Sequence, residues 1–365
     1  MIKFLDLNKI NQPYENAFQN KLKSVLNSGW YILGDEVKLF EKNYAAYCEA
    51  KYCIGVGNGF DALTLIYKAY IELGKMKKGD EVIVPANTYI ATILSIIQAD
   101  LVPVLVEPKF ETFTIDPNLI SEKITNKTKS ILAVNLYGQL ADLVSINEIA
   151  NKNNLIVVED SAQSHGAILN NSKSKNTQAF SFYPGKNFGA IGDAGAVVTN
   201  DDQLAEVLFS LRNYGSHVKY YNDFVGVNSR LDELQAAFLN VKLPNLDNEN
   251  QIRKKIAKRY LLEINNDNII LPFWDFSDNH VFHLFVIRTP KRNELQEFLK
   301  QNGIESLIHY PVAPHRQKAF IQWNNLQLPI TEKIHDEVLS LPISPVMTDT
   351  EIDFVIQKLN SWTYL

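Results

Sequence analysis

The residues of this sequence best suited to chemistry are a lysine and an aspartate, Lys186 and Asp160. Lys186 lies among aromatic residues and glycines in the segment 181–189, and the next carboxylate along the chain is Asp193. An amine in such surroundings loses hydration and is more easily deprotonated, which a lysine that forms a Schiff base requires. Asp160 follows the apolar run 155–158, a pattern typical of a buried parallel strand. Open α/β sheets bind their ligands at the carboxyl ends of such strands.

A lysine and a carboxylate of this kind together match what pyridoxal phosphate needs. Lys186 would hold the aldehyde as a Schiff base, and Asp160 would keep the ring nitrogen protonated so that the ring can accept electrons. Both residue types are common, and a lysine is usually a solvated surface group. The pair alone therefore does not separate a cofactor site from an ordinary surface.

Apolar runs that alternate with helical patterns organise the first part of the chain. We expect strands at 52–57, 81–85, 102–106, 130–134, 155–158 and 195–199. This alternation predicts an α/β fold with a mainly parallel sheet covered by helices on both faces. A polar helix at 247–262 is expected to connect this large domain, residues 1–250, to a small α+β domain at 251–365.

Three local patterns support the small domain. Residues 280–287 alternate as a strand would. Asn293 is a candidate N-cap of a helix that Gly303 ends. Thr348 and Glu351 have the spacing of a capping box for a last helix.

A glycine-rich turn stands between the first expected strand and the next helix. Gly55, Gly57 and Gly59 lie in it, and a glycine loop that opens a helix can bind phosphate through free N–H groups and the helix dipole. The spacing lacks the third glycine of a dinucleotide fingerprint and the Lys-Ser/Thr of a P-loop. Glycines at such turns are also common for steric reasons, so both explanations stay open.

Composition narrows the possible functions. The chain has 365 residues, 46% of them hydrophobic, and a net charge of −5, so no basic excess indicates nucleic acid as a partner. Cys48 and Cys53 lack a metal-site pattern, and we expect neither a metal nor a disulfide, which suits a reducing cytoplasm. The first residues lack the apolar core of a signal peptide, and no apolar run approaches membrane-spanning length.

Six segments in the same order resemble the sugar aminotransferases of the DegT/DnrJ/EryC1/StrS group, which have the aspartate-aminotransferase fold (fold type I). The matching segments are 28–34, 56–63, 159–167, 181–195, 226–237 and 309–311. A chance match to one of them is plausible, but six in order across nearly the whole chain are not. The resemblance implies a pyridoxal-phosphate enzyme that acts on nucleotide-linked keto sugars.

The resemblance also implies a role for particular residues. Lys186 binds the cofactor covalently and moves the proton between substrate and cofactor, and Asp160 pairs with the ring nitrogen. The other implied cofactor contacts are Gly59, Phe60, Tyr89, Gln163, Ser181 and, from the second subunit of a homodimer, Asn228. Many relatives carry Thr or Ser where Phe60 stands, so only its backbone N–H could reach a phosphate.

Each candidate substrate residue also has an ordinary structural explanation. His309, Tyr310 and His315 lie in a loop that the family places at the sugar, and Tyr183 is a further candidate. Lys219 and Tyr221 form a basic and aromatic cluster that would suit a diphosphate, although a solvated loop explains it as well.

The resulting hypothesis is an aminotransferase that converts a dTDP-3-keto-6-deoxyhexose to the 3-amino-3,6-dideoxyhexose, of Fuc3N or Qui3N type, with L-glutamate as donor. It depends on two features that look like the 3-amino branch. A large apolar residue, Phe60, follows Gly59, and Tyr310 is followed directly by Pro311, where 4-amino relatives tend to insert a residue. A 4-amino aminotransferase and a non-catalytic regulatory protein are the alternatives. A dehydratase on the same scaffold is disfavoured, because such relatives carry His in place of Lys186.

Overall fold

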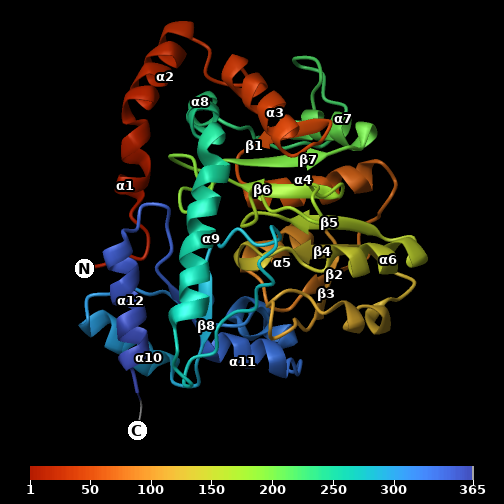
Figure 1. The fold of residues 1–365 in the computed structure, drawn as a ribbon. Coiled ribbons are helices and arrows are strands. Elements are labelled where there is room, and N and C mark those ends of the chain that lie inside the picture. The colour runs from red at the N-terminus through yellow and green to blue at the C-terminus, as the bar shows by residue number, and fades with distance from the viewer. Residues whose placement is uncertain (364–365) are drawn as a thin grey trace.

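A seven-stranded sheet forms the centre of the protein in the computed structural model, which describes residues 1–363 (Figure 1). Its strands, in spatial order, are β1 (Tyr52–Val56), β7 (Gly195–Thr199), β6 (Thr177–Ser181), β5 (Ile156–Asp160), β4 (Thr128–Val134), β2 (Glu81–Pro85) and β3 (Val102–Val106). The pairs from β6 to β3 are parallel, and β7 runs antiparallel to both of its neighbours. The predicted α/β class with a mainly parallel sheet is confirmed.

β6 is the strand of the large sheet that the sequence pattern missed, and β9 (Val338–Leu341) of the small sheet was also not predicted. β6 reads Thr-Gln-Ala-Phe-Ser, without the Val and Ile run of a buried strand. The fold accepts it because its polar side chains are paired: Thr177 shares a hydrogen bond with Thr199, and Gln178 donates to Ser161. Burial of polar groups is tolerated where each finds a partner.

Twelve helices of the described residues surround the two sheets. They are α1 (Leu7–Asn11), α2 (Glu15–Ser28), α3 (Asp35–Tyr47), α4 (Gly59–Glu72), α5 (Ile90–Gln98), α6 (Leu143–Asn153), α7 (Asp202–Leu211), α8 (Glu233–Lys242), α9 (Leu246–Glu263), α10 (Arg292–Gln301), α11 (Pro329–Glu337) and α12 (Asp349–Ser361). Among the helices that the structure describes, none is long and apolar enough to cross a membrane.

The C-terminal part has its own small sheet and core. β8 (Phe285–Arg288) pairs antiparallel with β9 (Val338–Leu341), and the core between this sheet, α9, α10 and α12 is apolar. The capping box of Thr348 and Glu351 is confirmed. The strand begins later than predicted, and the N-cap of α10 is Lys291, so the prediction of Asn293 as the cap was wrong. The predicted domain boundary after residue 250 falls inside α9.

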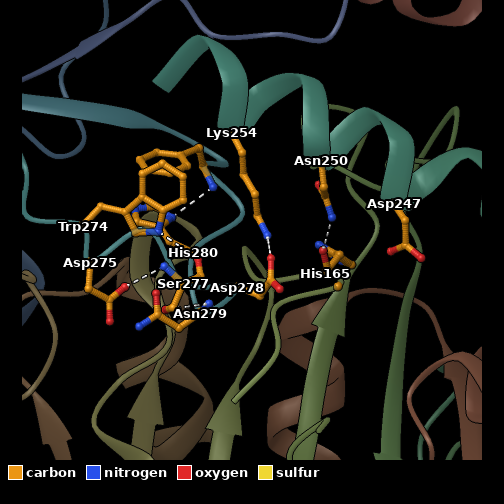
Figure 2. Close-up of polar contacts among 12 residues, drawn as sticks. His165, Asp247, Asn250, Lys254, Trp274, Asp275, Ser277, Asp278, Asn279 and His280 are labelled. Atoms are coloured by element: carbon orange, nitrogen blue, oxygen red, sulfur yellow. Dashed lines mark hydrogen bonds and ion pairs between the residues drawn. The ribbon is translucent and has the colours of Figure 1, made fainter. Parts of the chain in front are cut away.

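Helix α9 ties the small sheet to the loops of the large one. It runs alongside the large sheet toward the part formed by α10, α11 and α12 (Figure 1). From α9, the Asn250 amide donates to the carbonyl of His165 at 2.8 Å, and Lys254 pairs with Asp278 (Figure 2). The Asn250 carbonyl oxygen accepts a hydrogen bond from Asn187 at 2.9 Å. One helix residue therefore holds both the turn after Asp160 and the segment that carries Lys186.

A cluster of buried aromatic rings packs against the segment that carries Lys186. Phe182 and Phe188 flank the lysine and are fully buried, 5.4 Å apart between ring centroids. Phe40 and Tyr44 of α3 pack on them: Phe40 lies 5.3 Å from Phe182, and Tyr44 lies 5.6 Å from Phe188. Such ring pairs fix geometry as well as burying apolar area.

We expect Phe40→Ala to lower the free energy of unfolding by about 3–5 kcal/mol, because it opens a cavity in this cluster. The neighbouring residue Leu39 is 42% exposed, so Leu39→Ala serves as the control and should cost less than about 1 kcal/mol. Chemical denaturation followed by tryptophan fluorescence measures both. Equal losses for the two variants would contradict a supporting role for the ring cluster.

Candidate active site

A cavity of about 820 Å³ opens at the carboxyl end of β5, between the large sheet and the loops of the small one. Most of the predicted site residues line it: Gly59, Phe60, Tyr89, Asp160, Gln163, Ser181, Tyr183, Lys186, His309 and Tyr310. They come from distant parts of the chain, so the fold brings together what the sequence only suggested. The volume lies in the range of small-molecule sites.

Asp160 is the buried carboxylate of this cavity. Its Oδ2 accepts a hydrogen bond from the Thr92 hydroxyl at 2.7 Å, and its Oδ1 accepts one from the Ala162 N–H at 3.2 Å. Burial raises the pKa of Asp160, while Thr92, the Ala162 N–H and the charge of Lys186 act in the opposite direction. Thr92 in turn shares a hydrogen bond of 2.8 Å with Thr88. Sequence reasoning missed Thr92, whose role appears only once α5 is packed on the sheet.

Lys186 lies in the loop between β6 and β7 and faces the same cavity. Burial lowers the pKa of its amine to about 8, and the charge of Asp160 opposes that shift. The ordinary pKa of lysine is near 10.4. An appreciable fraction of Lys186 is therefore unprotonated near neutral pH, the form that can attack a carbonyl carbon.

Gln163 connects three parts of the site. Its carbonyl oxygen accepts the N–H of Tyr137 at 2.6 Å, and its amide group donates to the Tyr310 hydroxyl at 3.2 Å. The Tyr310 ring lies 5.2 Å from that of Tyr89. Gln163 therefore does more than cap its own turn, because it contacts Tyr137 and Tyr310, which are remote in sequence.

The start of α4 forms a cradle with Ser181. The Asn58 side chain caps the helix by accepting the Asp61 N–H at 2.8 Å, which leaves the N–H groups of Gly59 and Phe60 without an intrahelical partner. A Cβ at Gly59 would come within 2.7 Å of the Ser181 Cβ. Glycine is thus required for the helix end and Ser181 to approach, and the two together suit a phosphate.

Two histidines face the cavity. The Nδ1 of His309 is 2.8 Å from the Ser340 hydroxyl, and burial lowers the pKa of His309 to about 4, so the ring is neutral at pH 7. His283, which sequence reasoning missed, also lines the cavity. His165 does not: it is fully buried against Phe180 and Phe182, and burial lowers its pKa to about 3.

Four of the predicted site residues do not line the cavity of their own chain. His315 is buried, and its Nε2 is 3.0 Å from a carboxylate oxygen of Glu332. Lys219, Tyr221 and Asn228 are exposed and lie outside the lining. Their proposed roles toward a substrate or a second subunit stay predictions.

The fold and this site are those of an aminotransferase. Residues 13–360 match the DegT/DnrJ/EryC1/StrS aminotransferase family, and the chain belongs to that family.

Several relatives of the chain are named as sugar aminotransferases. The chain is 55% identical, over the full length of both proteins, to the dTDP-3-amino-3,6-dideoxy-alpha-D-galactopyranose transaminase of Aneurinibacillus thermoaerophilus. The crystal structure of DesV from S. venezuelae in complex with a ketimine intermediate has a TM-score of 0.94 and 42% identity, covering 99% of this chain and 98% of DesV. The crystal structure of NtdA from Bacillus subtilis with the bound cofactor PMP has a TM-score of 0.91 and 34% identity, and the match covers 98% of this chain and 83% of NtdA.

The Thr92 contact gives a test of how the carboxylate is held. Thr92→Val removes the hydroxyl that donates to Asp160 and should weaken pyridoxal-phosphate binding about 10- to 100-fold, because a hydrogen bond to a charged group contributes about 1.5–3 kcal/mol. Thr92→Ser keeps the donor and should bind as the unchanged protein does. Titration of cofactor absorbance measures both, and equal affinities for Thr92→Val and Thr92→Ser would contradict the contact.

Proposed function

We propose that this protein is a pyridoxal-phosphate aminotransferase that converts a dTDP-3-keto-6-deoxyhexose to the corresponding 3-amino-3,6-dideoxyhexose. The observation that carries the proposal is the pairing, in one cavity, of a lysine whose pKa is lowered to about 8 with a buried carboxylate. L-Glutamate is the proposed amino donor. The unpaired, buried Cys48 and Cys53 suit a protein of the reducing cytoplasm.

The residues present fit the cofactor. The cradle of Gly59, Phe60 and Ser181 offers neutral donors for its phosphate, and Asp160 offers an anion for its ring nitrogen. When bound, pyridoxal phosphate supplies an electron sink that stabilises negative charge on the carbon that loses a proton. Lys186 would hold the cofactor through its side-chain amine, and the same amine would move the proton between substrate and cofactor.

The sugar would lie against the small-domain side of the cavity. His309 and Tyr310 line that side, and Tyr183 is 58% exposed at the mouth. The neutral His309 can exchange hydrogen bonds with sugar hydroxyls without attracting a competing anion. Two of the relatives are named as transaminases of dTDP-3-amino sugars. Their names support the 3-amino branch over the 4-amino one.

We also propose a homodimer that shares its active sites. The loop that carries Lys219, Tyr221 and Asn228 exposes apolar side chains, with Val225 at 88% and Tyr220 at 84% exposure. Exposed apolar groups of this kind mark interaction surfaces, and two-fold dimers are the commonest soluble assembly. Asn228 would reach the cofactor phosphate of the partner subunit, and Lys219 and Tyr221 would contact the substrate diphosphate. His315 would act only indirectly, behind the sugar loop.

Covalent capture of the cofactor should depend on the state of Lys186. For cofactor-free protein, the capture rate should rise with pH and reach half of its maximum near pH 8, because only the unprotonated amine attacks the aldehyde and its fraction grows as pH passes the pKa. Lys186→Ala should show no capture while keeping its circular dichroism. Borohydride reduction and peptide mapping identify the labelled lysine, and labelling elsewhere or a midpoint above pH 10 would refute the assignment.

The substrate assignment is tested by separate half-reactions. The glutamate-loaded enzyme should transfer its amino group to dTDP-3-keto-6-deoxygalactose or dTDP-3-keto-6-deoxyglucose and not to a 4-keto-6-deoxy sugar nucleotide. Stopped-flow absorbance of the cofactor reports each transfer. Turnover of the 4-keto sugar alone would establish the 4-amino alternative, and a protein that binds the cofactor but reacts with neither glutamate nor sugar would favour the regulatory one.

Sharing of the sites is tested by mixing two inactive variants. Lys186→Ala lacks the lysine of its own site, and Asn228→Asp places an anion beside the phosphate of the partner's site. In a randomly mixed dimer population about 25% of the sites have both native residues, so mixing should restore about a quarter of the native activity. No recovery, despite subunit exchange shown by mass, would mean that each site is built from one chain.

A further inference from the structure

Glu305 is a cavity-lining carboxylate that the predicted set of site residues does not include. It follows α10 and pairs with the N-terminal strand-like segment, because its N–H donates to the Ile2 carbonyl at 2.9 Å and Ile2 donates to Gly303 at 2.7 Å. One side-chain oxygen, Oε2, accepts the N–H of Phe4 at 3.0 Å. No described residue forms a hydrogen bond or ion pair with the other oxygen, Oε1.

The segment that carries Glu305 is extended and presents alternate residues to the cavity. Glu305, Leu307 and His309 line it, whereas Ile304 and Ile308 pack into the apolar cores. Backbone hydrogen bonds between Leu307 and Ser340 hold this register. Because side chains alternate across an extended chain, Glu305 lies on the same face as His309, the proposed sugar contact.

The N-terminal segment places Glu305 near the reacting end of the cavity. Leu5, next to Phe4, packs 3.8 Å from the position of a Cβ on Gly185, the residue before Lys186. The ring of Phe4 lies 5.7 Å from that of His309. Phe4 and Leu5 therefore span the space between Glu305, the sugar loop and the catalytic lysine.

The chemistry of this position favours a hydroxyl over a phosphate. A carboxylate oxygen accepts hydrogen bonds and repels phosphates. A nucleotide sugar would enter with its uncharged ring toward Glu305 and its diphosphate toward the mouth. The apolar Leu5 and Leu307 beside it suit the deoxy carbon of the sugar.

We propose that the free oxygen of Glu305 accepts a hydrogen bond from the C4 hydroxyl of the keto sugar, next to the reacting carbon, and that Glu305 thereby selects 4-hydroxy over 4-deoxy sugars. This inference rests on the proposed function. A site built to bond a substrate hydroxyl rejects the analogue that lacks it, because the polar group is then left unpaired.

The test compares Glu305→Gln with the unchanged enzyme on two substrates, a dTDP-3-keto-6-deoxyhexose and its 4-deoxy analogue. Glutamine can still accept the Phe4 N–H, so the N-terminal segment stays in place. Glutamine then presents its NH2 group where the free carboxylate oxygen stood, so a hydrogen bond to a charged acceptor is replaced by a neutral one with the direction reversed. The kcat/KM for the 4-hydroxy sugar should fall about 10-fold, the difference between hydrogen bonds to charged and to neutral groups. The value for the 4-deoxy sugar should stay the same or rise, and the glutamate half-reaction should be unchanged.

Glu297→Gln is the control, since it removes the same charge from an exposed position of α10. Equal losses with both sugars would overturn the hydroxyl assignment. A matching loss in the glutamate half-reaction would show that Glu305 only anchors the N-terminal segment. If the unchanged enzyme turned over neither sugar, the proposed function would fail and this inference with it. If the enzyme turned over the 4-hydroxy sugar and Glu305→Gln kept the same preference between the two sugars, only this inference would fail.

Discussion

The amine of Lys186 and the carboxyl of Asp160, two groups that can carry opposite charges, line the same cavity. Burial favours the neutral form of each: it lowers the pKa of the lysine to about 8 and raises that of the aspartate. Each group opposes the shift of the other. Part of the Lys186 population can therefore be deprotonated near neutral pH. Asp160 accepts hydrogen bonds from two donors, Thr92 and the Ala162 N–H, which stabilise its ionised form.

The rest of the structure keeps these two groups in register. Asp160 is fixed by the end of a central strand, and Lys186 by aromatic rings on both sides of it. Asn250 joins the two loops from outside, since one amide contacts both His165 and Asn187. A change in the position of α9 would move both loops at once. Helix α9 therefore couples two loops that lie far from it in the sequence.

Patterns confined to one segment of the sequence could be predicted, and patterns that depend on packing could not. Asp160 and Lys186 stand out because a strand and an aromatic-glycine loop identify them locally. Thr92 could not be found, since its partner is 68 residues away and a threonine in a helix has no distinctive signal. Glu305 was missed for the same reason: its contact with Phe4 spans 301 residues. β6 was missed because its polar residues are paired only in the folded sheet.

The charges of the cavity bear on how the site is completed. Among the lining residues that the structure describes, Asp160, Asp193 and Glu305 are carboxylates and Lys186 is the amine. A phosphorylated cofactor and a nucleoside diphosphate both add negative charge to this surface. The N–H groups at the start of α4 can stabilise one phosphate, but the substrate diphosphate needs cations that this lining does not supply.

Lys219 lies on an exposed loop outside the lining. A second copy of the chain that brought this loop to the cavity mouth would place its positive charge where the diphosphate must lie. The electrostatics of the cavity therefore favour shared sites independently of the apolar surface of the loop.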